Sequence, residues 1–114
     1  MTMFRALLAA LFAIILIYTG IVGSNHGWNL MPVFFGDIAK MAWPGQFNVD
    51  FSCFLALSAT WLMWRHHFSG AGIFLGICGF FGGALFLTAY LLVASFQVDG
   101  DVKVLLLGKQ RAAG

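Results

Sequence analysis

Asp50 is the residue of this sequence best placed to do chemistry. It lies about one helical turn inside an apolar run, residues 47–64, that Trp43 and Trp64 bracket. A carboxylate inside a membrane is costly unless it is paired or hydrated, so it indicates a proton, cation or ligand contact. Partial burial would then raise its pKa. The alternative is a structural role, because free N–H groups in the first turn of a helix stabilise a negative charge.

The histidines and cysteines do not follow a metal-binding pattern. His66 and His67 are adjacent, so on a helix their side chains diverge by about 100°, and they are expected in a solvated turn. Cys53 and Cys78 lie in different apolar runs and are expected to pack as small apolar side chains. The chain has no P-loop, dinucleotide fingerprint or nucleophile–base pair. We therefore predict no metal site, no cofactor and no enzymatic activity.

The composition restricts the class of protein more strongly than any motif. Of 114 residues, 61% are hydrophobic and only 9% carry a formal charge. A soluble domain has about 25% charged residues, so this chain cannot cover a water-exposed surface. A disordered chain is excluded by the high hydrophobic content. A nucleic-acid-binding protein is excluded because the six Lys and Arg residues do not cluster. The composition predicts one small integral membrane domain over residues 1–114.

Apolar runs cover about residues 4–23, 47–64 and 71–96. A membrane core of ~30 Å is crossed by about 20 helical residues, so each run can span it. Arg5 precedes the first run as in a signal peptide, but we expect a retained anchor helix. The short turn through Ser69-Gly70 makes the second and third runs an antiparallel hairpin. We therefore predict an all-α, multi-pass protein with three transmembrane helices. Its interfacial anchors are the tryptophans Trp28, Trp43, Trp61 and Trp64.

The segments between and after these runs are amphipathic. Apolar residues of the segment 30–42 recur at steps of three and four, whereas Asp37 and Lys40 share the opposite side. This pattern predicts a helix that lies flat at the membrane interface. The tail, residues 97–114, is polar or amphipathic, and its apolar patch over residues 102–107 is too short to cross.

Three spans would place the two termini on opposite sides of the membrane. Arg5 and Arg65 would lie on one side, and the other side would hold four Lys and Arg residues together with all the aspartates. The larger number of cations favours a cytoplasmic C-terminus, whereas the Arg5 anchor pattern favours a cytoplasmic N-terminus, which we expect. The same topology would gather possible ligand or ion contacts at one membrane face. These are Asp50, His26, Asn48 and Tyr90, and the alternative is an ordinary set of interfacial polar residues.

Glycines form a stripe along the third apolar run. They recur at steps of four, three and four, so they share one face of a helix. Small residues allow close approach of two helices in lipid, which predicts a helix-packing interface. The helix packed there belongs either to this chain or to another subunit. The glycines of this stripe are Gly72, Gly76, Gly79 and Gly83.

Residues 43–94 resemble a family of small bacterial inner-membrane proteins. The resemblance is carried by Trp43-Pro44, by Asp50-Phe51 with Trp61 and Trp64 near the helix exit, and by Gly82-Gly83 followed by Tyr90-Leu91-Leu92. It implies a small bundle of membrane helices in the bacterial inner membrane and no particular activity.

Three functions are compatible with these features. The first is a non-catalytic accessory or assembly subunit that packs against itself or a larger membrane complex through the glycine face. The second is a small homo-oligomeric transporter or channel that uses Asp50. The third is a lipid- or pigment-binding module that uses the aromatic-rich surface. The expected partners are the lipid bilayer and other membrane subunits, and no nucleic acid is expected.

Overall fold

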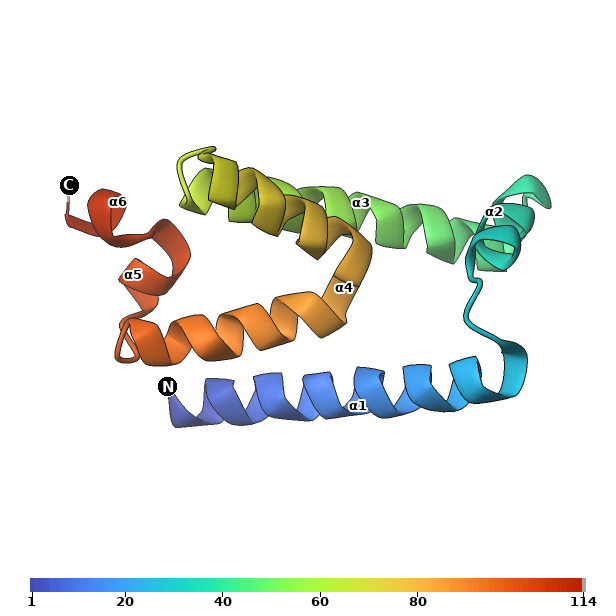
Figure 1. Cartoon of the computed structure of the whole chain (residues 1–114), viewed down its shortest axis with the longest axis horizontal. Helices are drawn as coiled ribbons and strands as arrows, with labels where there is room; N and C mark the ends of the chain where they lie inside the picture. The colour runs from blue at the N-terminus through green and yellow to red at the C-terminus, as the bar shows by residue number, and fades with distance from the viewer. Residues whose placement is uncertain (114) are drawn as a thin grey trace.

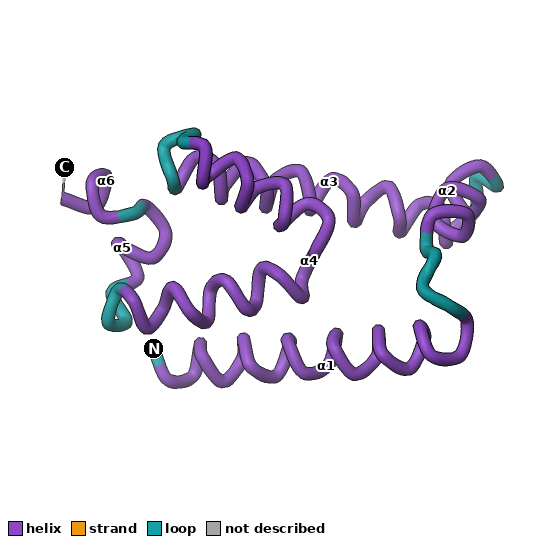
Figure 2. Tube along the Cα trace, in the orientation of Figure 1, coloured by secondary structure: helices purple, strands orange, loops and turns teal. Residues whose placement is uncertain are grey.

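The computed structural model describes residues 1–113, which form helices and no strand (Figure 2). The predicted all-α fold is therefore confirmed. The helices are α1 (Thr2–His26), α2 (Met31–Ala39), α3 (Trp43–Arg65), α4 (Gly70–Gln97), α5 (Val102–Leu107) and α6 (Lys109–Ala113).

The long helices α1 and α3 form the two outer rods of the molecule, and α4 lies between them (Figure 1). The α1 sequence has no charge after Arg5 and is rich in Leu, Ile and Ala, which favours one uninterrupted helix. It ends at Gly27, whose φ of 87° suits glycine. Arg5 fixes the start of α1 to the end of α4, because its Nε and Nη2 donate to Ser95 Oγ and O at 3.0 and 2.8 Å.

The helix predicted over residues 30–42 is present as the shorter α2, which packs on the start of α3 (Figure 1). Asn48 Nδ2 donates to the carbonyl oxygen of Phe34 at 3.1 Å and so ties α3 to α2. A Cβ on Gly45 would lie 2.9 Å from the Cα of Ile38, so only glycine allows this approach. Trp43 and Pro44 begin α3, where the missing N–H of proline is tolerated.

α4 is not the straight span that the sequence predicted over residues 71–96. Gly83 has φ 57° and ψ −141°, a conformation that L-residues rarely adopt, and the helix breaks there. The second half of α4 then returns toward the end where the first half began (Figure 1). Tyr90 accordingly contacts Arg65 at 2.9 Å. In a straight helix Tyr90, which is 20 residues after Gly70, would lie about 30 Å from the start of α4.

Two helices of residues 1–113, α1 and α4, are long and apolar enough to cross a membrane by length and composition. The predicted span in α3 does not reach this level, because Gln46, Asn48 and Asp50 make its first half polar. In the most apolar stretch of 18 residues, only 11% of α1 and 17% of α4 is buried within the chain. These helices therefore differ from the core helices of a soluble domain, which are mostly buried.

The reversal of α4 brings both termini to one end of the molecule (Figure 1). Three straight spans would have placed the termini at opposite ends of the molecule, and the reversal of α4 is the reason that they share one end. The tail residues 97–114 were predicted to be amphipathic, and residues 102–107 and 109–113 form the short helices α5 and α6. Asp101 caps α5, because its Oδ1 accepts hydrogen bonds from the N–H groups of Lys103 and Val104 at 3.0 and 3.3 Å.

Candidate functional site

The structure separates Tyr90 from the other residues of the polar group predicted around Asp50. Tyr90 lies beside Arg65, which is 15 residues beyond Asp50 on α3 and therefore about 22 Å farther along that helix. His26 is at the end of α1, and the side chain of Asn48 holds α2 instead. Tyr90 lies elsewhere because the prediction assumed a straight α4, whose C-terminal half would have ended at the opposite face.

Asp50 itself is exposed and lines an open cavity of about 520 Å³ where α2 meets α3. The other residues of this cavity include Gln46 and Cys53, whose thiol is free. Asp50 is about two turns into α3, beyond the first turn whose N–H groups it was expected to cap. Within residues 1–113, the Asp50 side chain makes no hydrogen bond or ion pair that would support either predicted role.

The glycine face of α4 packs on α3 of the same chain. Gly72, Gly76 and Gly79 are buried there, and a Cβ on Gly76 would lie 3.1 Å from the carbonyl oxygen of Ala59. A Cβ on Gly79 would lie 2.5 Å from Leu62 Cδ1. The fourth glycine, Gly83, is the point of reversal rather than a member of a continuous stripe.

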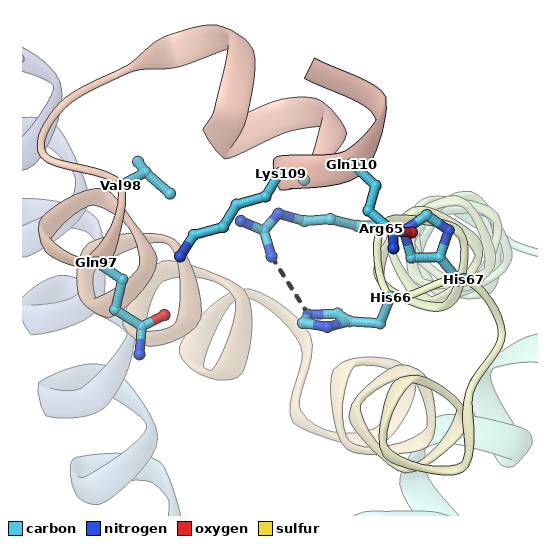
Figure 3. Close-up of a pocket in the computed structure, with 8 residues that line it drawn as sticks. Arg65, His66, His67, Gln97, Val98, Lys109 and Gln110 are labelled. Atoms are coloured by element: carbon cyan, nitrogen blue, oxygen red, sulfur yellow. Dashed lines mark hydrogen bonds between the residues drawn. The ribbon is translucent and has the colours of Figure 1, made fainter. Parts of the chain in front are cut away.

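A cluster of cationic and polar side chains is instead found where α3, α4 and the tail meet (Figure 3). Arg65 is its centre: Nε donates to the carbonyl oxygen of Leu105 at 2.6 Å, and Nη1 donates to the Tyr90 hydroxyl at 2.9 Å. His66 Nε2 is 2.5 Å from the same hydroxyl and 3.4 Å from Arg65 Nη1. These bonds connect the end of α3 to the returning half of α4 and to α5.

This cluster borders a cavity of about 530 Å³, which we call the cationic pocket. Arg65 and Lys109 point into it, and Lys109 extends toward Gln97 (Figure 3). All the polar side chains that line it can donate hydrogen bonds, and no carboxylate is among them. They are Arg65, His66, His67, Gln97, Lys109 and Gln110.

The electrostatic state of the pocket follows from these neighbours. Burial lowers the pKa of His66 below its ordinary value of 6.5, and the charges of Arg65 and His67 lower it further. His66 is therefore neutral at pH 7. The positive charge at this end comes from Arg65 and Lys109, to which Arg5 and Arg111 add from the surrounding helix ends.

The predicted tryptophan anchors lie at the two ends of the molecule. Trp61 Nε1 donates to the carbonyl oxygen of Leu106 at 3.0 Å, and its ring meets that of Tyr90 edge to face. Arg111 lies 4.0 Å above the ring of Trp64 and also donates to the Trp64 carbonyl oxygen. At the other end, Trp43 is exposed and the ring of Trp28 lies against Gly23.

The cationic pocket was not predicted from the sequence. His66 and His67 were expected in a solvated turn, and three straight spans would place Lys109 and Gln97 on the opposite side from Arg65. The one sequence signal for the correct arrangement was the Gly82-Gly83 pair, which interrupts an otherwise uniform apolar run. Within residues 1–113, no group of three or more His, Cys, Asp or Glu side chains could hold a metal ion.

No protein-family model, curated protein or solved structure matches this chain.

Proposed function

We propose that this protein is a multi-pass integral membrane protein that acts as a non-catalytic accessory or assembly subunit. The observation that supports this most directly is the apolar outer surface. Ile14 on α1, Leu57 on α3 and Phe81 on α4 are 64%, 68% and 75% exposed. In water a continuous apolar surface of this kind would cause aggregation. In a bilayer it is the surface that lipid tails and other transmembrane helices contact.

The proposed membrane arrangement has two crossings and one re-entrant hairpin. α1 and α3 contain 25 and 23 residues, which at 1.5 Å per residue gives about 37 and 34 Å, so both are long enough to cross, although α3 is less apolar than α1. Each half of α4 reaches about 20 Å and returns. Irregular backbone at this depth needs protein around it, and Gly83 packs on Phe51 and Leu55. The rival arrangement is three crossings with a straight α4.

The distribution of charge supports one orientation of this arrangement. Five of the six Lys and Arg residues lie at the end that carries both termini, and only Lys40 lies at the other end. Because loops rich in Lys and Arg stay in the cytoplasm, both termini are assigned to the cytoplasmic side. The assignment to a bacterial inner membrane depends on the family resemblance of residues 43–94 alone.

The accessory role is supported by how the cationic side chains are used. Three arginines donate to backbone carbonyl oxygens of distant helices: Arg5 to Ser95, Arg65 to Leu105 and Arg111 to Trp64. These bonds hold the ends of the helices together, which is a structural use of charge. Since the glycine face is occupied by α3, a partner would contact the outward face of α1, where Ile14 is exposed.

Purification of the intact protein from membranes in a mild detergent tests this function. An accessory subunit is expected to elute in a particle that contains other, larger membrane proteins. A homogeneous particle made only of this chain would favour the transporter or channel that uses Asp50. A coloured or lipid-rich monomer would favour the lipid- or pigment-binding module. The extent of extraction by alkaline carbonate provides the control for membrane integration, because only a peripheral protein is released.

A further inference from the structure

We propose that the cationic pocket binds a phosphate group, and that its source is the headgroup of an anionic phospholipid such as phosphatidic acid. This site goes beyond the accessory role, because it assigns a ligand to one end of the molecule. The pocket has the size of a small-ligand site, about 530 Å³. Its polar side chains are donors, which match the acceptor oxygens of a phosphate.

Arg65 is held in place before any ligand arrives. The carbonyl oxygen of Leu105 and the Tyr90 hydroxyl fix two sides of its guanidinium group. Both groups are neutral, so these bonds orient the positive charge without cancelling it. Nη2 also donates to the carbonyl oxygen of Val104, at 3.4 Å, and Nη1 lies 3.4 Å from His66 Nε2. A guanidinium carries five N–H donors, and the N–H of Nη2 that remains can face the pocket. Preorganised donors of this kind lower the entropy cost of binding an anion.

Lys109 supplies the second positive charge, and its side chain runs alongside that of Arg65 into the pocket (Figure 3). It belongs to the tail, extends into the cavity toward Gln97 and is exposed, so its ammonium group is free to approach a ligand (Figure 3). The acidic residues of this end, Asp99 and Asp101, are outside the lining, and Asp101 already accepts bonds from the α5 backbone. The charge inside the pocket is therefore positive.

The depth of the pocket in the proposed membrane matches a lipid headgroup. Trp61 and Trp64 lie within one turn of Arg65 on α3, and tryptophan prefers the membrane–water interface. Basic pockets between membrane helices on the cytoplasmic side bind anionic headgroups. In the orientation proposed above, the cationic pocket faces the cytoplasm.

An apolar groove on the same face can receive the acyl chain. The groove has a volume of about 380 Å³, and its lining includes Phe54, Ser58 and Trp61 of α3 and Leu87 of α4. Phe54, Ser58, Trp61 and Arg65 follow one another at steps of four, three and four, so one face of α3 lines both cavities. A ligand with a phosphate head and an apolar tail matches a cationic pocket followed by an apolar groove along this face of α3. Free phosphate would use only the pocket.

The test measures binding to the purified full-length protein in an uncharged detergent. The probes are dioctanoyl phosphatidic acid, dioctanoyl phosphatidylcholine and inorganic phosphate. We expect phosphatidic acid to bind at least about tenfold more tightly than the zwitterionic lipid, which corresponds to one charge-assisted hydrogen bond or more. Inorganic phosphate that binds as tightly as phosphatidic acid would make free phosphate the source. Equal affinity for both lipids, without phosphate binding, would overturn the site.

Matched variants separate the pocket from general surface charge. Lys109→Gln is expected to weaken phosphatidic acid binding about tenfold. Lys103→Gln removes the same charge from the same tail outside the pocket lining, and it should keep wild-type affinity. Equal losses in both variants would show only nonspecific attraction and overturn the proposal. Lys109 is exposed, so the variant is expected to fold, and its thermal unfolding is measured to check this. The composition of the detergent-extracted particle reports on the accessory role separately.

Discussion

Arg65 Nη1 and the Tyr90 hydroxyl lie 2.9 Å apart, and this contact joins the end of α3 to the returning half of α4. The two residues are 25 positions apart in the chain. The contact requires the break at Gly83, because only a reversed α4 carries Tyr90 back toward its own starting end. The cationic pocket, the common end of the termini and the charge asymmetry all depend on this reversal.

Cross-linking with a short bifunctional thiol reagent, in a variant without Cys53 and Cys78, can test the reversal. We expect Trp61→Cys with Tyr90→Cys to be cross-linked, because the rings at these positions contact each other, with centroids 6.0 Å apart. The control pair is Gln46→Cys with Tyr90→Cys. Gly83 lies against Phe51, so a straight antiparallel α4 would carry residue 90 about seven positions back toward the start of α3, close to Gln46. Electrophoresis or mass analysis of the treated protein distinguishes the pairs, and preferential cross-linking of the control pair would contradict the reversal.

The membrane arrangement predicts a pattern of labelling by a membrane-impermeant maleimide. In the same cysteine-free background, Thr2→Cys, Ser24→Cys and Lys103→Cys each place a thiol at an exposed position. We expect Ser24→Cys to be labelled from outside intact cells, and the other two only after the membrane is opened. The three-crossing arrangement would instead label Lys103→Cys together with Ser24→Cys.

The sequence was sufficient to predict the helical fold and the approximate bounds of its long helices. Residue type and period determine these features locally, as in the charge-free run that becomes α1 and the amphipathic segment that becomes α2. The helix-packing face of Gly72, Gly76 and Gly79 was also visible, although the sequence could not assign the helix that covers it. That helix is α3 of the same chain.

The site could not be predicted, because it depends on one backbone conformation. Hydropathy does not distinguish a glycine inside a straight apolar helix from one with a positive φ, and Gly83 is the latter. A single reversal moves Tyr90, Gln97 and the whole tail from one end of the molecule to the other. This is why Tyr90 lies far from Asp50 and why the two termini share one end.

A large side chain on the glycine face of α4 is expected to destabilise the protein more than the same side chain on an open helix surface. Gly76→Leu places a side chain where a Cβ alone would lie 3.1 Å from the carbonyl oxygen of Ala59 on α3. We expect overpacking to lower the free energy of unfolding by about 1–3 kcal/mol. The matched control is Gly20→Leu on α1, where a Cβ meets nothing within 4 Å. Thermal unfolding in detergent measures both. A similar loss in the two variants would indicate a general effect of leucine rather than close packing of α3 and α4.

The lowered pKa of His66 predicts how stability changes with pH. The unfolded chain protonates this imidazole near pH 6.5, whereas burial and the charge of Arg65 keep it neutral to lower pH in the folded protein. The unfolded state therefore binds more protons below pH 6.5, so the contribution of His66 to the free energy of unfolding decreases as the pH falls through this window. Above pH 6.5 this contribution is fully present.

His66→Gln tests this linkage, because glutamine has no titrating group at the same position. Thermal unfolding of the ligand-free protein between pH 7.5 and pH 5.5 should show a smaller decrease in Tm for His66→Gln than for the wild type. The groups that face His66 are Arg65, His67, Lys109 across the pocket and the Tyr90 hydroxyl, and all are unchanged in this variant. His26→Gln, at the opposite end of the molecule, is the control and should keep the wild-type decrease. An unchanged slope in His66→Gln would mean that another group carries the pH dependence, and the neutral imidazole between Arg65 and Tyr90 would have to be abandoned.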